Sequence, residues 1–267
     1  MPETLKTARI GVTTSGRPGD ALAGEARAAA AAVGLPYLDR AGLPSRRALF
    51  ERSGVDALVV FEGRRLSVVD RQGTLRFAEG LARLRVQQLQ RGGADRLVDL
   101  ARFERGEAVL DCTLGLAADA QVAAWAVGPA GRVVGLESSP VLCLLARHGL
   151  PRLARLAPAA AIDVQLADAH ELLPRLPTGS FDVVLFDPMF AHRRKASPAF
   201  EQLRRYADPR PLTAELLREG RRVARRLVLV KAARSSELRR LGLTAEPGPA
   251  AAHVRWARAA PLPPGPR

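Results

Sequence analysis

Cysteine and histidine are scarce in this 267-residue chain, and long apolar runs are missing from it. The two cysteines, Cys112 and Cys143, are too few for a disulfide framework and badly spaced for zinc. His148, His170 and His253 stand alone, without metal-ligand spacing. No apolar run approaches the ~18 residues of a membrane helix, and the N-terminus lacks the regions of a signal peptide. We therefore expect a cytoplasmic protein with neither a metal site nor a membrane segment.

Lysine is also rare, at positions 6, 195 and 231 only, so 38 of the 41 basic residues are arginine. Genomic base composition explains why Arg replaces Lys, but it does not explain the net charge of +14. Residues 191–240 hold 15 Arg and Lys against 5 Asp and Glu, and thus contribute +10 of that charge. A surplus confined to one region predicts a polyanionic partner such as nucleic acid.

The hydrophobic pattern before residue 107 predicts a small α/β lobe followed by helices. We assign residues 1–73 to the lobe and 74–106 to a helical connector. The expected strands are 8–14, 55–61 and 65–69, and the expected helices are 19–33, 43–53, 77–90 and 95–103.

From residue 107 strands alternate with helices, which is typical of a doubly wound, mostly parallel sheet of Rossmann-like α/β class. The expected strands are 108–111, 132–137, 162–166, 181–187 and 227–231, with a weaker one at 252–258. Helices are expected at 116–127, from 140 onward and at 213–226. We assign 107–260 to this domain and 261–267 to a flexible tail.

Acidic residues stand at the ends of three successive predicted strands. Asp111 ends the first strand, Glu137 ends the second and Asp168 follows the third. Ligands of such sheets bind just beyond the carboxyl ends of the strands. Gly115 allows the backbone to approach a ligand, Glu137 is placed to accept ribose hydroxyls, and Asp168 is placed to face an adenine amino group. The set predicts a nucleoside-containing cofactor.

The missing phosphate-binding motif narrows the choice of cofactor. The chain has no G-x-G-x-x-G loop, which NAD would require. The loop between the first strand and the first helix of this domain, here called the first loop, lies between Asp111 and Asp119. These two carboxylates would repel a pyrophosphate. They suit S-adenosylmethionine, which carries a ribose, an ammonium and a sulfonium but no phosphate. Taken singly, Asp111 and Asp119 could equally be helix caps.

The fourth predicted strand of this domain leads into a loop that suits a nucleobase. It begins Asp187-Pro188-Met189-Phe190 and continues into basic residues. Asp187 is the candidate acceptor for an amine N–H, with the Pro188 carbonyl as a second acceptor. Phe190 is placed to stack on a flipped base, although it could pack in the core. The expected RNA contacts are His192, Arg193, Arg194 and Lys195, of which His192 could instead brace the loop.

These motifs resemble the class I methyltransferases, and more narrowly the RsmJ-type family of bacterial 16S ribosomal RNA guanine-N2 methyltransferases, over roughly residues 75–235. The matching segments are 110–120, 136–140 and 187–195. The family's first loop usually reads Gly-Leu-Gly-Arg-Asp, where this chain has Ala117 and Ala118 in place of the second Gly and the Arg. The cofactor contacts that the resemblance implies are Ala118, Asp119, Glu137, Ser138, Asp168, Ala169 and Asp187.

The resemblance implies methylation of an exocyclic amine, guanine N2 in small-subunit ribosomal RNA, with S-adenosylmethionine as the methyl donor. Other targets stay open, because related loops serve enzymes that methylate adenine in RNA or DNA, or small amines. A non-catalytic RNA-binding assembly factor on the same fold is the alternative from another class. The sequence makes no prediction of the oligomeric state.

Overall fold

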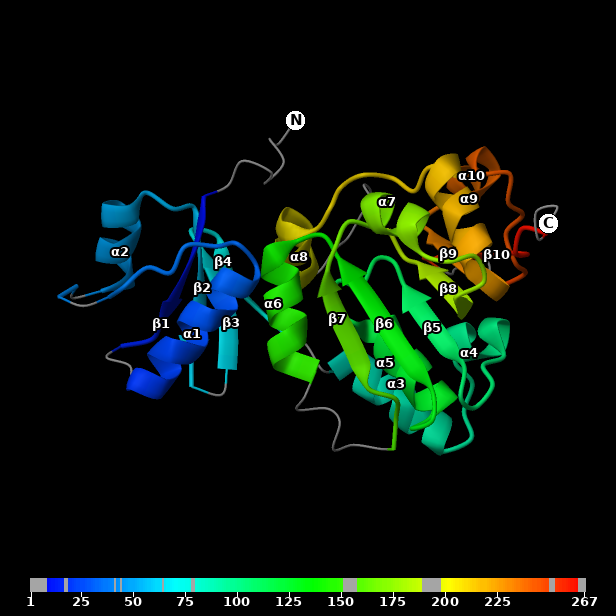
Figure 1. Ribbon diagram of the computed structural model, residues 1–267, viewed down its shortest axis with the longest axis horizontal. Helices are drawn as coiled ribbons and strands as arrows, with labels where there is room; N and C mark the ends of the chain where they lie inside the picture. The colour runs from blue at the N-terminus through cyan, green and yellow to red at the C-terminus, as the bar shows by residue number, and fades with distance from the viewer. Residues whose placement is uncertain are drawn as a thin grey trace.

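The computed structural model describes residues 9–16, 19–40, 42–43, 45–63, 65–77, 80–150, 158–188, 198–249 and 253–263. Two β-sheets lie side by side in it, with helix α6 (Pro140–Gly149) between them (Figure 1). Apolar side chains of α6, including Leu142 and Leu145, share one buried cluster with Val59 and Val68 of the first sheet. The N-terminal lobe is therefore packed against the second sheet's own helix layer.

The first sheet has four strands in the order β1-β2-β3-β4. Its elements are β1 (Ile10–Thr14), α1 (Asp20–Ala32), α2 (Arg46–Ser53), β2 (Ala57–Glu62), β3 (Arg65–Asp70) and β4 (Gly73–Arg76). β1 runs parallel to β2, whereas β3 and β4 are added antiparallel. β4 was not predicted, since Leu75 is its only buried residue. The lobe boundary placed at residue 73 falls on the first residue of this strand, so the sheet continues to Arg76.

The second sheet has six strands in the order β10-β9-β8-β5-β6-β7. Its strands are β5 (Ala108–Asp111), β6 (Arg132–Glu137), β7 (Ile162–Leu166), β8 (Phe181–Phe186), β9 (Ala224–Ala232) and β10 (Arg255–Ala259). Only the pairing of β10 with β9 is antiparallel among these strands. The prediction of a doubly wound, mostly parallel sheet is confirmed.

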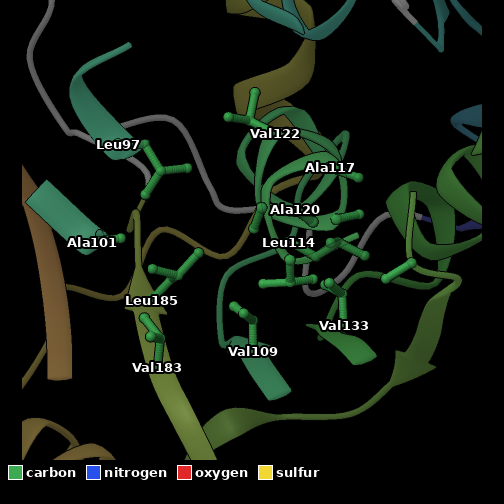
Figure 2. Close-up of a cluster of buried hydrophobic side chains, with 14 of the residues drawn as sticks. Leu97, Ala101, Val109, Leu114, Ala117, Ala120, Val122, Val133, Val183 and Leu185 are labelled. Atoms are coloured by element: carbon green, nitrogen blue, oxygen red, sulfur yellow. The ribbon is translucent and has the colours of Figure 1, made fainter. Parts of the chain in front are cut away.

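Helices cover both faces of this sheet. They are α3 (Gly80–Gln90), α4 (Arg96–Ala101), α5 (Ala118–Val127), α6, α7 (Ala169–Leu172), α9 (Ala214–Val223) and α10 (Ser235–Arg240), with a 3-10 turn at Leu173–Arg175. The remaining helix, α8 (Pro198–Tyr206), packs against β4 of the first sheet. Figure 2 shows part of the buried cluster that α5 shares with the sheet, with Ala120 of α5, Leu114 of the preceding loop, and Val109 and Val133 of the strands. The small alanine side chains of α5 let the helix lie close to the strands.

The helix predicted at 213–226 is wrong at its C-terminal end. α9 stops at Val223, and Ala224 already pairs with Phe181 of β8. The next residues, Arg225 and Arg226, therefore lie on strand β9, where they bind Asp182 and Glu107. Strand pairing and these two ion pairs override the helical pattern of the sequence.

α8, which was not predicted, returns the chain to the N-terminal lobe. Tyr206 Oη donates a 2.8 Å hydrogen bond to Asp70 Oδ2, and Arg205 Nη1 lies 2.9 Å from the same oxygen. Near the C-terminus, Leu262 N donates to the Arg221 carbonyl at 2.9 Å. Thus the segment predicted as a flexible tail from 261 begins attached to α9, and residues 264–267 lie outside the described residues.

Candidate active site

A pocket lies beyond the carboxyl ends of β5, β6, β7 and β8. β5 stands between β6 and β8, which is the point where the strand order reverses and where open α/β sheets bind their ligands. Six predicted cofactor residues line the pocket, namely Gly115, Glu137, Ser138, Asp168, Ala169 and Asp187. Pro188, a predicted catalytic residue, lines it too. The structure therefore brings these residues to one place.

Glu137 ends β6 with its carboxylate turned back onto the first loop. Oε2 accepts a 2.8 Å hydrogen bond from Gly115 N, and Oε1 accepts one of 2.7 Å from Ser139 N. Burial raises the pKa of Glu137 to about 7, although the two amides oppose this rise. Both oxygens keep a second lone-pair site, so the carboxylate can still accept hydroxyl groups.

The first loop passes through two residues with left-handed backbone. Gly115 has φ 55°, and a side chain there would enter open space. Ala117 has φ 58° and is fully buried, although this conformation disfavours residues with a Cβ by roughly 1–2 kcal/mol. Ala117 replaces the second glycine of the family loop, so the chain keeps a glycine conformation without the glycine.

Asp168 follows β7 and caps α7. Oδ1 accepts from His170 N at 2.9 Å, and Oδ2 accepts from Arg210 Nη2 at 2.7 Å. Burial opposes ionisation, but the hydrogen bonds from Arg210 and His170 outweigh it and hold the pKa of Asp168 below its usual value. Asp208 also binds Arg210, and both residues line the same pocket. The predicted adenine contact of Asp168 stays a prediction.

Asp187 directly follows β8 and is held from two sides. Its backbone N donates to Thr113 Oγ1 at 2.6 Å, which joins it to the first loop. Its Oδ2 accepts from Lys231 Nζ at 2.7 Å. Asp187 thereby stands at the switch point between β5 and β8, with its side chain about one third exposed (36%).

The two carboxylates that flank the first loop, Asp111 and Asp119, bind other residues of the protein. Asp119 on α5 forms ion pairs with Arg85, at 2.7 Å, and with Lys231. Asp111 is buried and accepts a 3.0 Å hydrogen bond from Thr113 N. Burial, followed by the nearby charge of Asp119, raises the pKa of Asp111 to about 7. Asp111, Ala118 and Asp119 lie outside the pocket lining formed by the described residues, and their cofactor roles stay predictions.

The remaining predicted residues of the loop lie outside the described residues. These are Phe190, His192, Arg193, Arg194 and Lys195. Their roles in base stacking and RNA contact stay predictions.

Sequence reasoning missed several residues of this site. Thr113 and Arg210 gave no signal, because their partners lie far away in the sequence. Lys231 did leave one: it is one of three lysines in a chain that otherwise uses arginine. A lysine near the end of a predicted strand, in a chain that otherwise uses arginine, was a signal that the sequence offered for this position.

Many of the basic side chains of residues 191–240 form ion pairs with carboxylates of this same chain. Carboxylates pair with Arg205, Arg210, Arg222, Arg225, Arg226 and Lys231. Arg239 and Arg240 on α10 are exposed. The charge count of this segment therefore overstates the positive surface that its described part offers to a polyanion.

A second cavity, of about 520 Å³, lies between α3, α5 and β7 and is lined by residues such as Val86, Trp125 and Ile162. Its described lining contains none of the predicted site residues. Leu150 and Ala159, at its edge, flank the segment 151–157, which is not described. We therefore place the active site at the strand ends.

Membrane spans and metal clusters are both absent from the described part of the chain. No helix there is long and apolar enough to cross a membrane. No group of three or more His, Cys, Asp or Glu side chains among the described residues is arranged to hold a metal ion.

The strand order and the carboxylate-lined switch point define a Rossmann-like enzyme of the class I methyltransferase type. The family described as "Putative SAM-dependent methyltransferase" matches residues 52–240, and the chain belongs to this family. It is thus an S-adenosylmethionine-dependent methyltransferase, as the resemblance implied.

Individual relatives and solved structures are also similar to this chain. The chain is 33% identical to the "Uncharacterized protein YpiP" of Bacillus subtilis over 82% of this chain and 87% of that protein. It is 37% identical to "Ribosomal RNA small subunit methyltransferase J" of Laribacter hongkongensis, over 63% of this chain, and spans 61% of that relative's length. The crystal structure of the SAM-dependent methyltransferase NGO1261 from Neisseria gonorrhoeae matches with a TM-score of 0.60 at 20% identity, covering 94% of this chain and 96% of that one. This last likeness shows the fold alone.

Proposed function

We propose that this methyltransferase acts on an exocyclic amine of a nucleobase, and that its target is N2 of a guanine in small-subunit ribosomal RNA. The observation that carries the proposal is the position of Asp187 and Pro188. They leave β8 at the switch point and line the same pocket as Glu137 and Asp168. Relatives named "Ribosomal RNA small subunit methyltransferase J" support the choice of RNA.

The pocket residues fit S-adenosylmethionine, which supplies an activated methyl group when bound. Glu137 would hold the ribose hydroxyls, since two backbone amides already orient its carboxylate. Asp168 would accept from the adenine amino group, and Ser138 and Ala169 would flank the ring. Open space beside Gly115 lets the backbone approach the cofactor. The lining carries carboxylates in place of a phosphate-binding loop.

The chain's own contribution to the reaction is positioning. The lone pair of a guanine amino group is delocalised into the ring, so the nitrogen must be oriented. Asp187 would accept one N–H of that amine and offset the positive charge that develops on the nitrogen, and the Pro188 carbonyl would accept the other. Holding the nitrogen in line with a methyl carbon can supply much of the rate enhancement.

The RNA would be bound by the loop that follows Pro188. Phe190 would stack on the extruded base, worth roughly 1–3 kcal/mol. His192, Arg193, Arg194 and Lys195 would contact the flanking backbone, the basic ones through phosphates. A cytoplasmic location, where ribosomal subunits are assembled, belongs to the same proposal.

The proposal is tested by methyl transfer from labelled S-adenosylmethionine to small ribosomal subunits and to naked 16S RNA. Asp187→Ala should abolish transfer, because it removes the acceptor of the amine. Asp182→Ala, at the opposite end of β8, is the matched control and should retain transfer. If the Asp187 variant methylated RNA at the parent rate, or if the label appeared on adenine, a ribose or a ring carbon, the assignment would be wrong.

A further inference from the structure

Lys231 is a buried cation beside the proposed acceptor. It lies on β9, where its neighbour Val230 pairs with Phe186 of β8, so it follows the strands to the same edge as Asp187. Its Nζ lies 2.7 Å from Asp187 Oδ2 and also forms an ion pair with Asp119 Oδ2. The ring of Trp256, its partner on β10, has its centroid 4.8 Å from the ammonium. The Lys231 side chain is only 14% exposed.

Burying an ammonium costs free energy unless charged partners compensate for it. Burial by itself would favour the neutral amine, but the charges of Asp187 and Asp119 outweigh it and raise the pKa of Lys231. Lys231 is therefore an ammonium over the whole working range of an enzyme. Removing this charge from water costs free energy of folding. If Lys231 served packing alone, an apolar side chain would stabilise the fold better.

A second cation keeps the ammonium in place. Asp119, on the far side of Lys231, accepts from Arg85 Nη1 at 2.7 Å. Arg85 lies on α3 and is held in turn by both oxygens of Asp95, at 2.7 and 3.0 Å. The ion pairs thus run from Asp95, the N-cap residue of α4, through α3, α5 and β9 to the residue that follows β8. Lys231 is thus held by Asp119 on one side while it binds Asp187 on the other.

The charge of the ammonium matters because carboxylates crowd this region. Asp111, Asp119 and Asp187 lie near one another, and the charges of Asp119 and Asp187 both disfavour ionisation of Asp111. Lys231 and Arg85 are the cations that the described residues place among them. Removing Lys231 would take the ammonium away from Asp187 and Asp119 while Arg85 stays on Asp119. The loss of a cation next to a carboxylate favours the protonated form of that carboxylate.

We propose that Lys231 is a positioning residue, which keeps the Asp187 carboxylate ionised and in one orientation toward the target amine. The inference rests on the proposed role of Asp187 as the acceptor. An acceptor that carried a proton would offer an O–H to the amine in place of a lone pair. An untethered carboxylate would lose the orientation that in-line transfer needs.

Three variants separate charge from geometry and packing. Lys231→Met keeps an unbranched side chain, shorter by its terminal atom, and removes the charge. Lys231→Arg keeps the charge in a planar fork of different shape. Arg239→Met, on the exposed surface of α10, removes a charge away from the site and serves as the control. Lys231→Gln replaces Lys231→Met if the latter is not recovered folded, as judged by its binding of S-adenosylmethionine.

The first measurement is a carboxyl ¹³C NMR titration of the protein without RNA, with Asp187 assigned by its loss in Asp187→Asn. In Lys231→Met the Asp187 signal should titrate about 1 to 3 pH units higher than in the parent, because an adjacent cation is lost. Lys231→Arg and Arg239→Met should titrate like the parent. An Asp187 signal that titrates at the same pH with and without Lys231 would overturn the inference.

The second measurement is the single-turnover rate of methyl transfer as a function of pH. Lys231→Met should slow transfer by up to about 100-fold. In its pH–rate profile, the acidic limb, where the rate rises with pH, should move to higher pH. Lys231→Arg should slow transfer without moving that limb. A folded Lys231→Met enzyme with the parent rate and pH profile would assign Lys231 to stability alone. A parent enzyme that modifies a different acceptor would overturn the proposed target, while the RNA-free titration would still decide the inference on Lys231.

Discussion

Glu137 Oε2 accepts a 2.8 Å hydrogen bond from the backbone N of Gly115. This bond joins the end of β6 to the loop after β5, and so couples the carboxylate that we propose for ribose binding to the backbone that would face the cofactor. The loop cannot move away from the strand end without breaking this hydrogen bond to a buried carboxylate oxygen, which costs free energy. The site is thus organised by its own side chains before a ligand arrives.

The first prediction concerns cofactor affinity. Glu137→Ala should weaken the binding of S-adenosylmethionine by on the order of 1–3 kcal/mol, because the hydrogen bonds that a charged group makes are removed. Isothermal calorimetry measures this directly. Asp182→Ala should leave the affinity unchanged, since Asp182 binds Ala108 N and Arg225 at the other end of the sheet. NAD should not bind to any of these proteins, and NAD binding without S-adenosylmethionine binding would contradict the assignment.

The second prediction tests the strained backbone of Ala117. Both Ala117→Gly and Ala120→Gly remove one buried methyl group from the same cluster. Ala117 has a positive φ, however, whereas Ala120 lies inside α5. Ala117→Gly should therefore be more stable than Ala120→Gly by about 1–2 kcal/mol, the cost of a Cβ in left-handed backbone. Urea unfolding of the two variants measures the difference, and equal stabilities would mean that Ala117 is not strained.

The third prediction concerns pH. The pKa of Asp111 is about 7 in the fold, against an ordinary value of 3.8. Between pH 4 and 7 the unfolded chain therefore releases a proton that the folded chain retains, so stability falls as pH rises. Above pH 7 Asp111 is ionised in both the folded and the unfolded chain, so its destabilising contribution to the free energy of unfolding stays constant. Asp111→Asn should remove this dependence and stabilise the protein at pH 8 by on the order of 1–4 kcal/mol.

Urea unfolding at pH 4.5 and pH 8 measures this effect. Asparagine can still accept from Thr113 N, so the loop keeps its hydrogen bond. Asp163→Asn, on the exposed side of β7, is the control and should change stability little at either pH. An Asp111→Asn variant that lost stability at pH 8 would show that the charge of Asp111 is needed by its neighbours.

The fourth prediction concerns RNA affinity. Replacing Arg193, Arg194 and Lys195 with Ala should flatten the dependence of log affinity on log salt, by roughly 0.7–0.9 for each phosphate that the protein no longer neutralises. Cofactor affinity should stay nearly unchanged. A matched triple variant of Arg47, Arg65 and Arg71, on the N-terminal lobe, removes the same charge elsewhere. If only the lobe variant flattened the slope, the RNA path would run over the lobe and not over the loop.

The strand ends of the second sheet were predictable from local sequence. The short apolar runs before Asp111, Glu137 and Asp187 each fit one buried strand, and parallel strands bring their carboxyl ends to one edge. β4 carries a single buried residue and lacks such a run. The α9–β9 boundary was missed, since arginine suits a helix and only pairing with β8 shows that Arg225 lies on a strand.

The partners of the site carboxylates were not predictable in the same way. Lys231 reaches Asp119 and Asp187, and Arg85 reaches Asp119, only because distant segments are packed together. No local pattern encodes such ion pairs. The sequence predicted which carboxylates gather at the switch point, whereas the structure shows which cations hold them.

The central claim is methylation of a guanine amine in small-subunit ribosomal RNA, and nucleoside mass spectrometry of that RNA tests it most directly. RNA from a strain that lacks this gene should lack one N2-methylguanosine that the parent strain carries. The parent gene should restore it, and Asp187→Ala should not. An unchanged set of methylated guanosines, or the loss of a methyladenosine in its place, would contradict the account.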